Sequence, residues 1–105
     1  MSIERYFNKN IVIRRERELG SNKRGVQATA TADAWYDDLD AQERSQLGII
    51  GERAWRFWFR LDEDVQEGDI LVDQDTNDRF FVREVTKRDI GINRHLEILA
   101  VEHNA

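Results

Sequence analysis

Four oxygen-bearing side chains between residues 73 and 84 have a spacing that could bind a metal ion. They match positions 1, 3, 5 and 12 of a calcium-binding loop, and they are Asp73, Asp75, Asn77 and Glu84. Calcium is a hard cation that prefers closely spaced oxygen ligands. Asp78, however, stands where the pattern requires glycine, and the flanking residues predict strands instead of helices. We therefore interpret this segment as a tight acidic hairpin turn, with a calcium site as the alternative.

Residues for catalysis are sparse in this chain. The two histidines, His95 and His103, have no spacing that a metal site or a catalytic triad needs. The sequence contains no phosphate-binding glycine loop and no G-x-S-x-G motif. It contains no cysteine, which excludes disulfides and thiolate metal sites. We expect a protein that is not an enzyme and that needs no cofactor.

The stretch from Arg53 to Asp69 is the strongest structural signal. Apolar side chains occupy alternate positions, and in a strand they share one face, which carries Trp55, Phe57, Phe59 and Leu61. The opposite face carries Arg56, Trp58 and Arg60. The composition predicts a strand, an acidic turn and a returning strand that starts at Ile70.

The Arg56, Trp58 and Arg60 face is a candidate surface for another subunit or partner, because Trp and Arg are common interface anchors. An aromatic side chain beside arginines could also stack on bases, as in oligonucleotide-binding barrels. The net charge of -5 and the lack of a second aromatic platform speak against that alternative.

A second candidate site is the segment 40–52, which we predict to project between two strands. Asp40 and Glu43 form a capping-box pattern that predicts a short helix. The proposed interaction or gate loop follows it, and consists of Gln46, Leu47, Gly48, Ile49, Ile50 and Gly51. Two branched apolar residues between glycines either pack beneath the loop or form a mobile contact.

The remaining elements predict an all-β fold, a small six- to seven-stranded barrel with one short helix in an inserted loop. The predicted strands cover 10–17, 26–35, 70–74, 79–88 and 96–101, in addition to the one beginning at Arg53. The alternating alanines of 26–35 also leave a helix open, although the strict period of two favours a strand. Residues 79–88 break clean alternation, which predicts a bulge. The run 14–17 is charged and edge-like.

Size and composition are consistent with one domain that spans residues 1–105, with residues 1–9 as an N-terminal arm. Tyr6 and Phe7 could anchor this arm to the core or to a neighbouring chain. The sequence shows no apolar run of membrane-spanning length and no signal-peptide core. We expect a soluble protein that is made in the cytoplasm and has no membrane partner.

Charge is distributed unevenly along the chain. Residues 1–25 carry seven bases and three acids, whereas residues 62–78 carry eight acids and no base. Two solvated loops would explain this distribution. Subunits that pack head to tail in a ring would also explain it, because their contacting ends are complementary.

The order of these features resembles the head-closure, or head–tail joining, proteins of tailed bacteriophages. The similarity covers about Ile11 to Val101 and rests on four sets of residues. They are Trp55 to Arg60, Val65 with Gly68-Asp69-Ile70, Phe81-Val82 and His95 to Leu99.

This resemblance implies a small β-barrel that assembles as a dodecameric ring in the virion. Such a ring docks beneath the portal and adaptor proteins, retains packaged double-stranded DNA without reading its sequence, and contacts the tail. The family's projecting segment, which can act as a gate, corresponds here to 40–51, although this segment is rather short. A tail-terminator ring protein is a neighbouring alternative. An acidic channel would repel DNA and let it slide.

Overall fold

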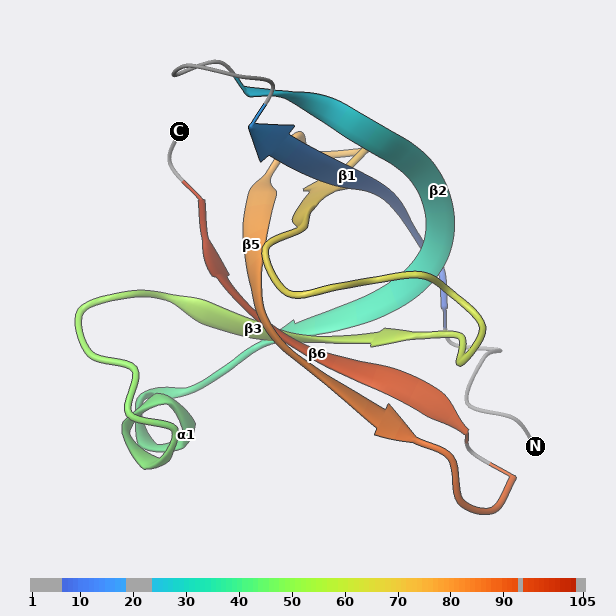
Figure 1. Ribbon diagram of the computed structural model, residues 1–105. Coiled ribbons are helices and arrows are strands. Elements are labelled where there is room, and N and C mark those ends of the chain that lie inside the picture. The colour runs from blue at the N-terminus through green and yellow to red at the C-terminus, as the bar shows by residue number, and fades with distance from the viewer. Residues whose placement is uncertain (1–6, 19–23, 93, 104–105) are drawn as a thin grey trace.

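The chain folds into a closed barrel of six antiparallel strands (Figure 1). The computed structural model describes residues 7–18, 24–92 and 94–103. The strands are β1 (Lys9–Glu18), β2 (Arg24–Asp38), β3 (Ala54–Phe59), β4 (Ile70–Asp73), β5 (Arg79–Arg88) and β6 (His95–Glu102). One short helix, α1 (Ala41–Gln46), lies between β2 and β3. The predicted all-β barrel with a short helix in an inserted loop is confirmed.

The order of strands around the barrel is β1-β2-β3-β6-β5-β4. β3 pairs with β2 and β6, whereas β4 pairs with β1 and β5. The predicted return of the chain from β3 into a neighbouring strand is therefore wrong. The segment 60–69 instead crosses from one side of the barrel to the other, with Val65 buried in the core on the way. Turn composition marks a change of direction, but it does not say which strand the chain joins next.

The aromatic row of β3 forms the centre of the barrel core, as its alternation predicts. Phe57 and Phe59 are fully buried, and Trp55 and Leu61 pack against the same cluster. Tyr36 of β2 stacks on Phe57 with 4.6 Å between ring centroids. In the β2–β3 ladder Ala34 stands directly opposite Phe59, and both side chains are fully buried.

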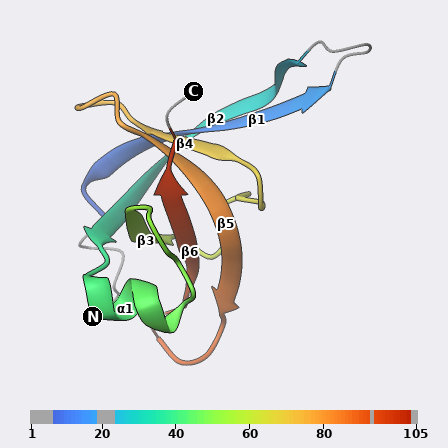
Figure 2. The same cartoon turned by 90° about the vertical axis from the view of Figure 1, so that its left-hand side faces the viewer.

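β1 and β2 extend beyond the barrel as a long two-stranded ribbon (Figure 2). β1 pairs with β4 only over Ile11 to Arg14, so its last four residues pair with β2 alone. The predicted edge character of 14–17 is thus correct for the end of this run, although Arg14 is paired on both sides. The predicted bulge in β5 lies between Val82 and Glu84.

The insertion of residues 39–53 covers a second, smaller core outside the barrel. Leu39, Ile49, Ala54 and Val101 are buried there, and Leu99 packs against them. Phe7 is also buried, which fits an anchor for the N-terminal arm, while Tyr6 lies outside the described residues. The strand β1 begins at Lys9, inside the range predicted for the arm. Residues 19–23, between β1 and β2, are likewise outside the described part.

Candidate partner-binding surface

The insertion begins with the capping box that the sequence predicts. The Asp40 carboxylate accepts a hydrogen bond from the Glu43 backbone N–H at 2.8 Å. The Glu43 carboxylate in turn accepts from the Asp40 N–H at 3.4 Å. These two bonds satisfy amide groups that a helix start leaves without partners. They fix where the chain turns away from β2.

The end of α1 is closed by a glycine in the left-handed region. Gly48 has φ +74°, and its N–H donates to the Ser45 carbonyl at 3.1 Å. The Ile49 N–H donates to the Arg44 carbonyl at 2.9 Å. This pair of bonds is a Schellman motif, which satisfies the last helical carbonyls. Gly48 therefore serves to end the helix, and its positive φ does not by itself indicate a mobile loop.

The structure separates the two isoleucines of the proposed gate loop. Ile49 is 6% exposed and belongs to the second core, whereas Ile50 is 89% exposed. Of the two interpretations of this pair, packing beneath the loop is correct for Ile49, and the interpretation of both residues as exposed contacts is wrong for it. The Schellman motif turns the residue after its glycine back onto the preceding helix, and this places Ile49 beneath the insertion. Within this loop, Ile50 and the 46% exposed Leu47 are the apolar side chains that reach solvent.

The outer face of β3 is connected to this insertion. Arg56 is half-buried, and its Nη1 lies 3.6 Å from Oε2 of Glu43 on α1. A shallow hollow beside it is lined by Arg56 and Leu47 together with residues of β5 and β6. The structure thus brings two of the predicted site segments together on one surface.

Trp58 has an aromatic partner that the sequence analysis missed. In the β2–β3 ladder, Trp58 stands directly opposite Trp35, and both side chains are half-buried on the outer face. On its other side it is opposite Glu97 of β6. The alternation of 26–35 places Trp35 outward, but only the pairing of β2 with β3 places it beside Trp58. The expected lack of a second aromatic platform is therefore wrong.

Arg60 connects the β3 face to a second exposed apolar loop. It lines a hollow with Leu61, Asp62, Lys87, Gly91, Ile92 and Arg94. This hollow lies beside the β5–β6 loop, where Ile90 is 90% exposed and Ile92 is 75% exposed. The sequence predicts no site between the strands at 79–88 and 96–101. The signal that could have indicated one is two isoleucines flanking a glycine, which parallels the pattern at 48–51.

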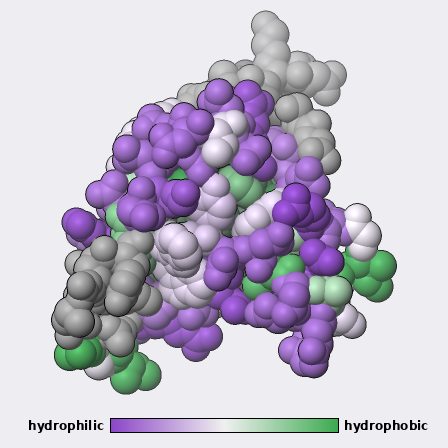
Figure 3. Space-filling model, turned by 180° about the vertical axis from the view of Figure 1, so that it is seen from behind, coloured by the Kyte–Doolittle hydropathy of each residue, from purple (hydrophilic) through white to green (hydrophobic). Residues whose placement is uncertain are grey.

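The two exposed aliphatic loops lie toward the same side of the barrel. In Figures 1 and 2, the α1 insertion and the β5–β6 loop both occupy the lower part of the molecule. Hydrophobic side chains gather at two separate places in the lower half of Figure 3, where these loops are located. We call Leu47 and Ile50 the insertion tip, and Ile90 and Ile92 the hairpin tip.

Part of the charge complementarity between residues 1–25 and residues 62–78 is satisfied within one chain. The Arg15 guanidinium donates from Nε and Nη2 to the two carboxylate oxygens of Asp69, at 3.0 and 2.9 Å. Its Nη1 donates to the carboxylate of Asp64 at 3.0 Å. This hydrogen bond, together with the positive charge, lowers the pKa of Asp64. These two acids are therefore already paired with a base of the same chain.

Asp73, the first residue of the calcium pattern, is a buried internal acceptor. It accepts the Tyr36 hydroxyl at 2.5 Å and the Asp75 backbone N–H at 2.9 Å. Burial, and then the hydrogen bond to Asp73, raises the pKa of Tyr36. The turn 74–78 connects β4 and β5 as the predicted acidic hairpin. Within the described residues, no group of three or more His, Cys, Asp or Glu side chains is placed to bind a metal.

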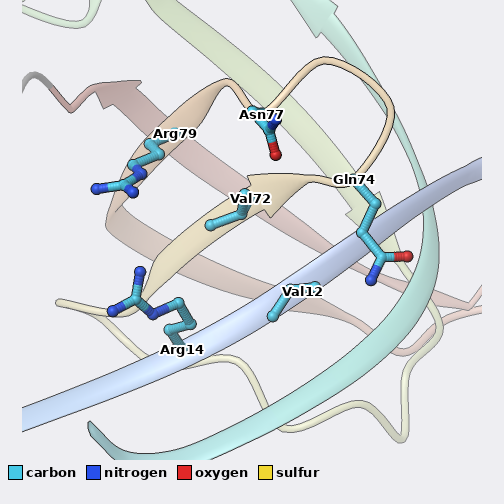
Figure 4. A pocket seen from close by; sticks show the side chains of 6 residues that line it. All are labelled: Val12, Arg14, Val72, Gln74, Asn77 and Arg79. Carbon is cyan, nitrogen blue, oxygen red and sulfur yellow. The ribbon is translucent and has the colours of Figure 1, made fainter.

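A further hollow lies on the outer faces of β1 and β4 and on the turn that follows (Figure 4). Its lining side chains are Val12, Arg14, Val72, Gln74, Asn77 and Arg79. Arg14 also pairs with Glu16 at 3.3 Å. None of these six lining residues is a carboxylate, a histidine or a hydroxyl group, so the hollow lacks the usual side chains for acid–base or nucleophilic chemistry.

No helix in the described part of the chain is long and apolar enough to cross a membrane. A comparison of the sequence with protein-family models and with curated proteins gave no match.

Proposed function

We propose that this protein is a virion structural protein of a tailed bacteriophage, a subunit of the head-closure or head–tail connector ring. In this role it is made in the host cytoplasm, joins the portal–adaptor complex to the tail, and helps to retain packaged DNA. The ordered sequence features described above support the proposal, and so does a barrel of the kind that the resemblance implies.

The observation that carries the proposal is the pair of exposed aliphatic tips on one side of the barrel. Ile50, Ile90 and Ile92 are each at least three-quarters exposed in the single chain. Exposed aliphatic side chains are unfavourable in water unless a partner covers them. The outer face of β3 between the tips carries Arg56, Trp58 and Arg60, which suit an interface. A subunit surrounded by identical neighbours and by ring-shaped partners would cover such a surface.

In this proposal fewer residues of the segment 46–51 form the gate than the sequence predicts. Ile49 supports the insertion from beneath, and Ile50 alone supplies the branched side chain that could meet its equivalents around a channel. The net charge of -5 suits a channel through which double-stranded DNA slides without tight binding.

The proposal is tested in the phage that encodes this chain, by stopping its synthesis with a nonsense codon. We expect filled heads that lose their DNA and unattached complete tails, with normal particles restored by the supplied wild-type protein. An Ile50→Ser variant should restore tail joining but retain DNA less well. Normal infectious particles without the protein would overturn the proposal. Tails of uncontrolled length would favour the tail-terminator alternative.

A second candidate function, binding of single-stranded nucleic acid, is favoured by the Trp35–Trp58 juxtaposition beside Arg56 and Arg60. Bases stack on such aromatic side chains, and each stack contributes about 1–3 kcal/mol. Asp33 and Asp37 on the same outer face of β2 oppose this function, because they repel phosphate. Binding of labelled oligonucleotides at low salt, lost in Trp58→Ala and weakened by added salt, would support the second function.

A further inference from the structure

The ribbon of β1 and β2 leaves one edge of β2 without a neighbouring strand. β2 pairs with β1 over Arg24 to Ala34, but it pairs with β3 only from Ala34 to Asp38. In the described part of the chain, no strand pairs with the second edge of β2 over 24–33. The backbone hydrogen bonds found there outside the strand ladders also do not involve these residues. We call this stretch the open edge of β2 (Figures 1 and 2).

The register shows which backbone groups point out of the open edge. The Asn10 carbonyl accepts the Gln74 N–H at 3.0 Å, so Asn10 directs its polar groups toward β4 and away from β2. Asp33, opposite Asn10, must then direct its own N–H and C=O toward the open edge. Because the direction alternates along a strand, Thr31 and Thr29 do the same. On the β3 side, the Leu39 N–H donates to the Ala54 carbonyl at 2.9 Å. Odd-numbered residues of β2 thus direct their backbone polar groups toward the β3 side, which independently agrees with the direction inferred for Asp33, Thr31 and Thr29.

This edge lacks most of the features that normally prevent strand pairing. Thr29, Ala30 and Thr31 are exposed, and residues 25–32 carry no charge and no proline. Soluble proteins usually protect an edge with charged residues, proline, a bulge or a covering element. A register shift near Gln27 interrupts the ladder with β1, but residues 28–33 beyond it are regularly paired. The end of β1 is protected differently, since it reads Arg14-Arg15-Glu16-Arg17-Glu18.

We propose that the open edge of β2 binds the same edge of a second copy of this chain, as an antiparallel strand pair centred on Ala30. A two-fold axis through Ala30 places Thr29 of each copy opposite Thr31 of the other, and Ala30 opposite Ala30. Thr–Thr pairs on one face and Ala–Ala pairs on the other make the stretch complementary to itself.

Charge selects the antiparallel orientation over the parallel one. Asp33 lies at the end of the open edge that is nearest to β3. Asp33 is also close enough to Glu63 to contribute to the raised pKa of that carboxyl, after burial and Asp62. In the antiparallel pair centred on Ala30, Asp33 of each copy stands opposite the uncharged Gln27 of the other. A parallel pair in register would bring like charges together.

The contact is small, which sets the expected behaviour. The two Thr29–Thr31 pairs form about four backbone hydrogen bonds, so we expect a weak dimer that dissociates on dilution. The inference goes beyond the proposed function, because it concerns β2 and involves neither aliphatic tip. If the open-edge contact does not form, the proposed function is unaffected, and the reverse also holds.

Cysteine cross-linking tests the register directly, because the wild-type chain has no cysteine. The two Ala30 residues would form a pair that is not hydrogen-bonded, with Cα atoms about 4.5 Å apart, within the range for a disulfide. We expect purified Ala30→Cys to form a covalent dimer rapidly under mild oxidation. Thr76→Cys, on the exposed β4–β5 turn, is the matched control and should cross-link only slowly. Equal rates for the two variants would overturn the proposal.

Sedimentation of variants tests the backbone contact without a cross-link. Thr31→Pro removes an N–H that β1 does not use, so the barrel should keep its melting temperature while dimer affinity falls about tenfold or more. Thr31→Val keeps the N–H and should retain the dimer. The Thr29→Lys, Thr31→Lys double variant should be monomeric and should recover dimers when mixed with the Thr29→Glu, Thr31→Glu variant. The mixing experiment with the charged double variants tests the contact even if Thr31→Pro disturbs folding. A wild-type monomer at millimolar concentration, or a dimer indifferent to these changes, would refute the open-edge contact.

Discussion

The Arg15 guanidinium holds the Asp69 carboxylate through two parallel hydrogen bonds, Nε to Oδ1 at 3.0 Å and Nη2 to Oδ2 at 2.9 Å. Asp69 is 1% exposed and also accepts the Gln66 N–H at 2.8 Å. The pair joins β1 to the residue immediately before β4, at the point where their ladder ends. It therefore connects the base of the projecting ribbon to the segment that crosses the barrel.

Removing Arg15 should destabilise the folded chain strongly. Arg15→Ala leaves the buried Asp69 carboxylate without its cationic partner, which typically costs about 3–5 kcal/mol. Arg15→Lys retains a charge but not the two-bonded geometry, and we expect an intermediate loss. Urea unfolding followed by tryptophan fluorescence measures both changes. An Arg15→Ala variant as stable as wild type would show that the pair contributes nothing to folding.

The same arginine should control the titration of Asp64. Its hydrogen bond lowers the pKa of this carboxyl below the ordinary value of about 3.9. The associated stability is therefore fully present above that value and is lost as pH falls through the lowered pKa. A carboxyl-detected NMR titration should show the Asp64 pKa moving upward in Arg15→Ala. Arg14→Ala, which removes a neighbouring charge outside this cluster, should leave it in place.

Tyr36 should make the barrel sensitive to high pH. Burial and the hydrogen bond to Asp73 raise its pKa above the ordinary value of about 10. The unfolded chain thus releases the phenol proton first, so this contribution is complete below pH 10 and is lost as pH rises toward the folded pKa. Tyr36→Phe should remove this alkaline dependence and cost about 1–3 kcal/mol at pH 7, because the Asp73 carboxylate loses the hydroxyl that donates a hydrogen bond to it.

Ultraviolet difference titration of wild type and Tyr36→Phe measures the phenol directly. The half-buried hydroxyl, which is hydrogen-bonded to Asp73, should ionise only together with unfolding. A phenol that titrates in the native state near its ordinary pKa would contradict the burial argument.

The two faces of β3 should differ sharply in their effect on stability. Phe57→Ala and Phe59→Ala each create a cavity in the packed core and should cost about 3–5 kcal/mol. Arg60 is exposed, and Arg60→Ala should change the free energy of unfolding by less than about 0.5 kcal/mol. Chemical denaturation of the three variants makes this comparison. If Phe57→Ala were as stable as wild type and Arg60→Ala were unfolded, the assignment of the buried and exposed faces of β3 would be reversed.

The adjacent isoleucines of the insertion form a matched pair of tests. Ile49→Ser removes a buried side chain from the second core and should cost at least about 2 kcal/mol. Ile50→Ser changes an exposed side chain and should leave folding within about 0.5 kcal/mol of wild type. Thermal unfolding distinguishes them. If both variants melt like wild type, the second core does not stabilise the subunit.

Local patterns predicted most of the elements, because strand alternation and helix caps depend on near neighbours in sequence. The alternation around Phe57 predicted β3 and its buried face, and Asp40 with Glu43 predicted the start of α1. The calcium-like spacing at Asp73 was correctly interpreted as a hairpin turn. Such features rest on side-chain periodicity and on hydrogen bonds within one turn of chain.

Only the tertiary structure decided which strands meet. The sequence fixes each strand's faces, but not the partner across each ladder, since any strand edge offers the same backbone donors and acceptors. The placement of Trp35 beside Trp58, the pairing of Arg15 with Asp69, and the open edge of β2 all depend on that choice. Ile49 and Ile50 differ for a related reason: their types are identical, and only the turn after Gly48 determines which one faces the second core and which one faces water.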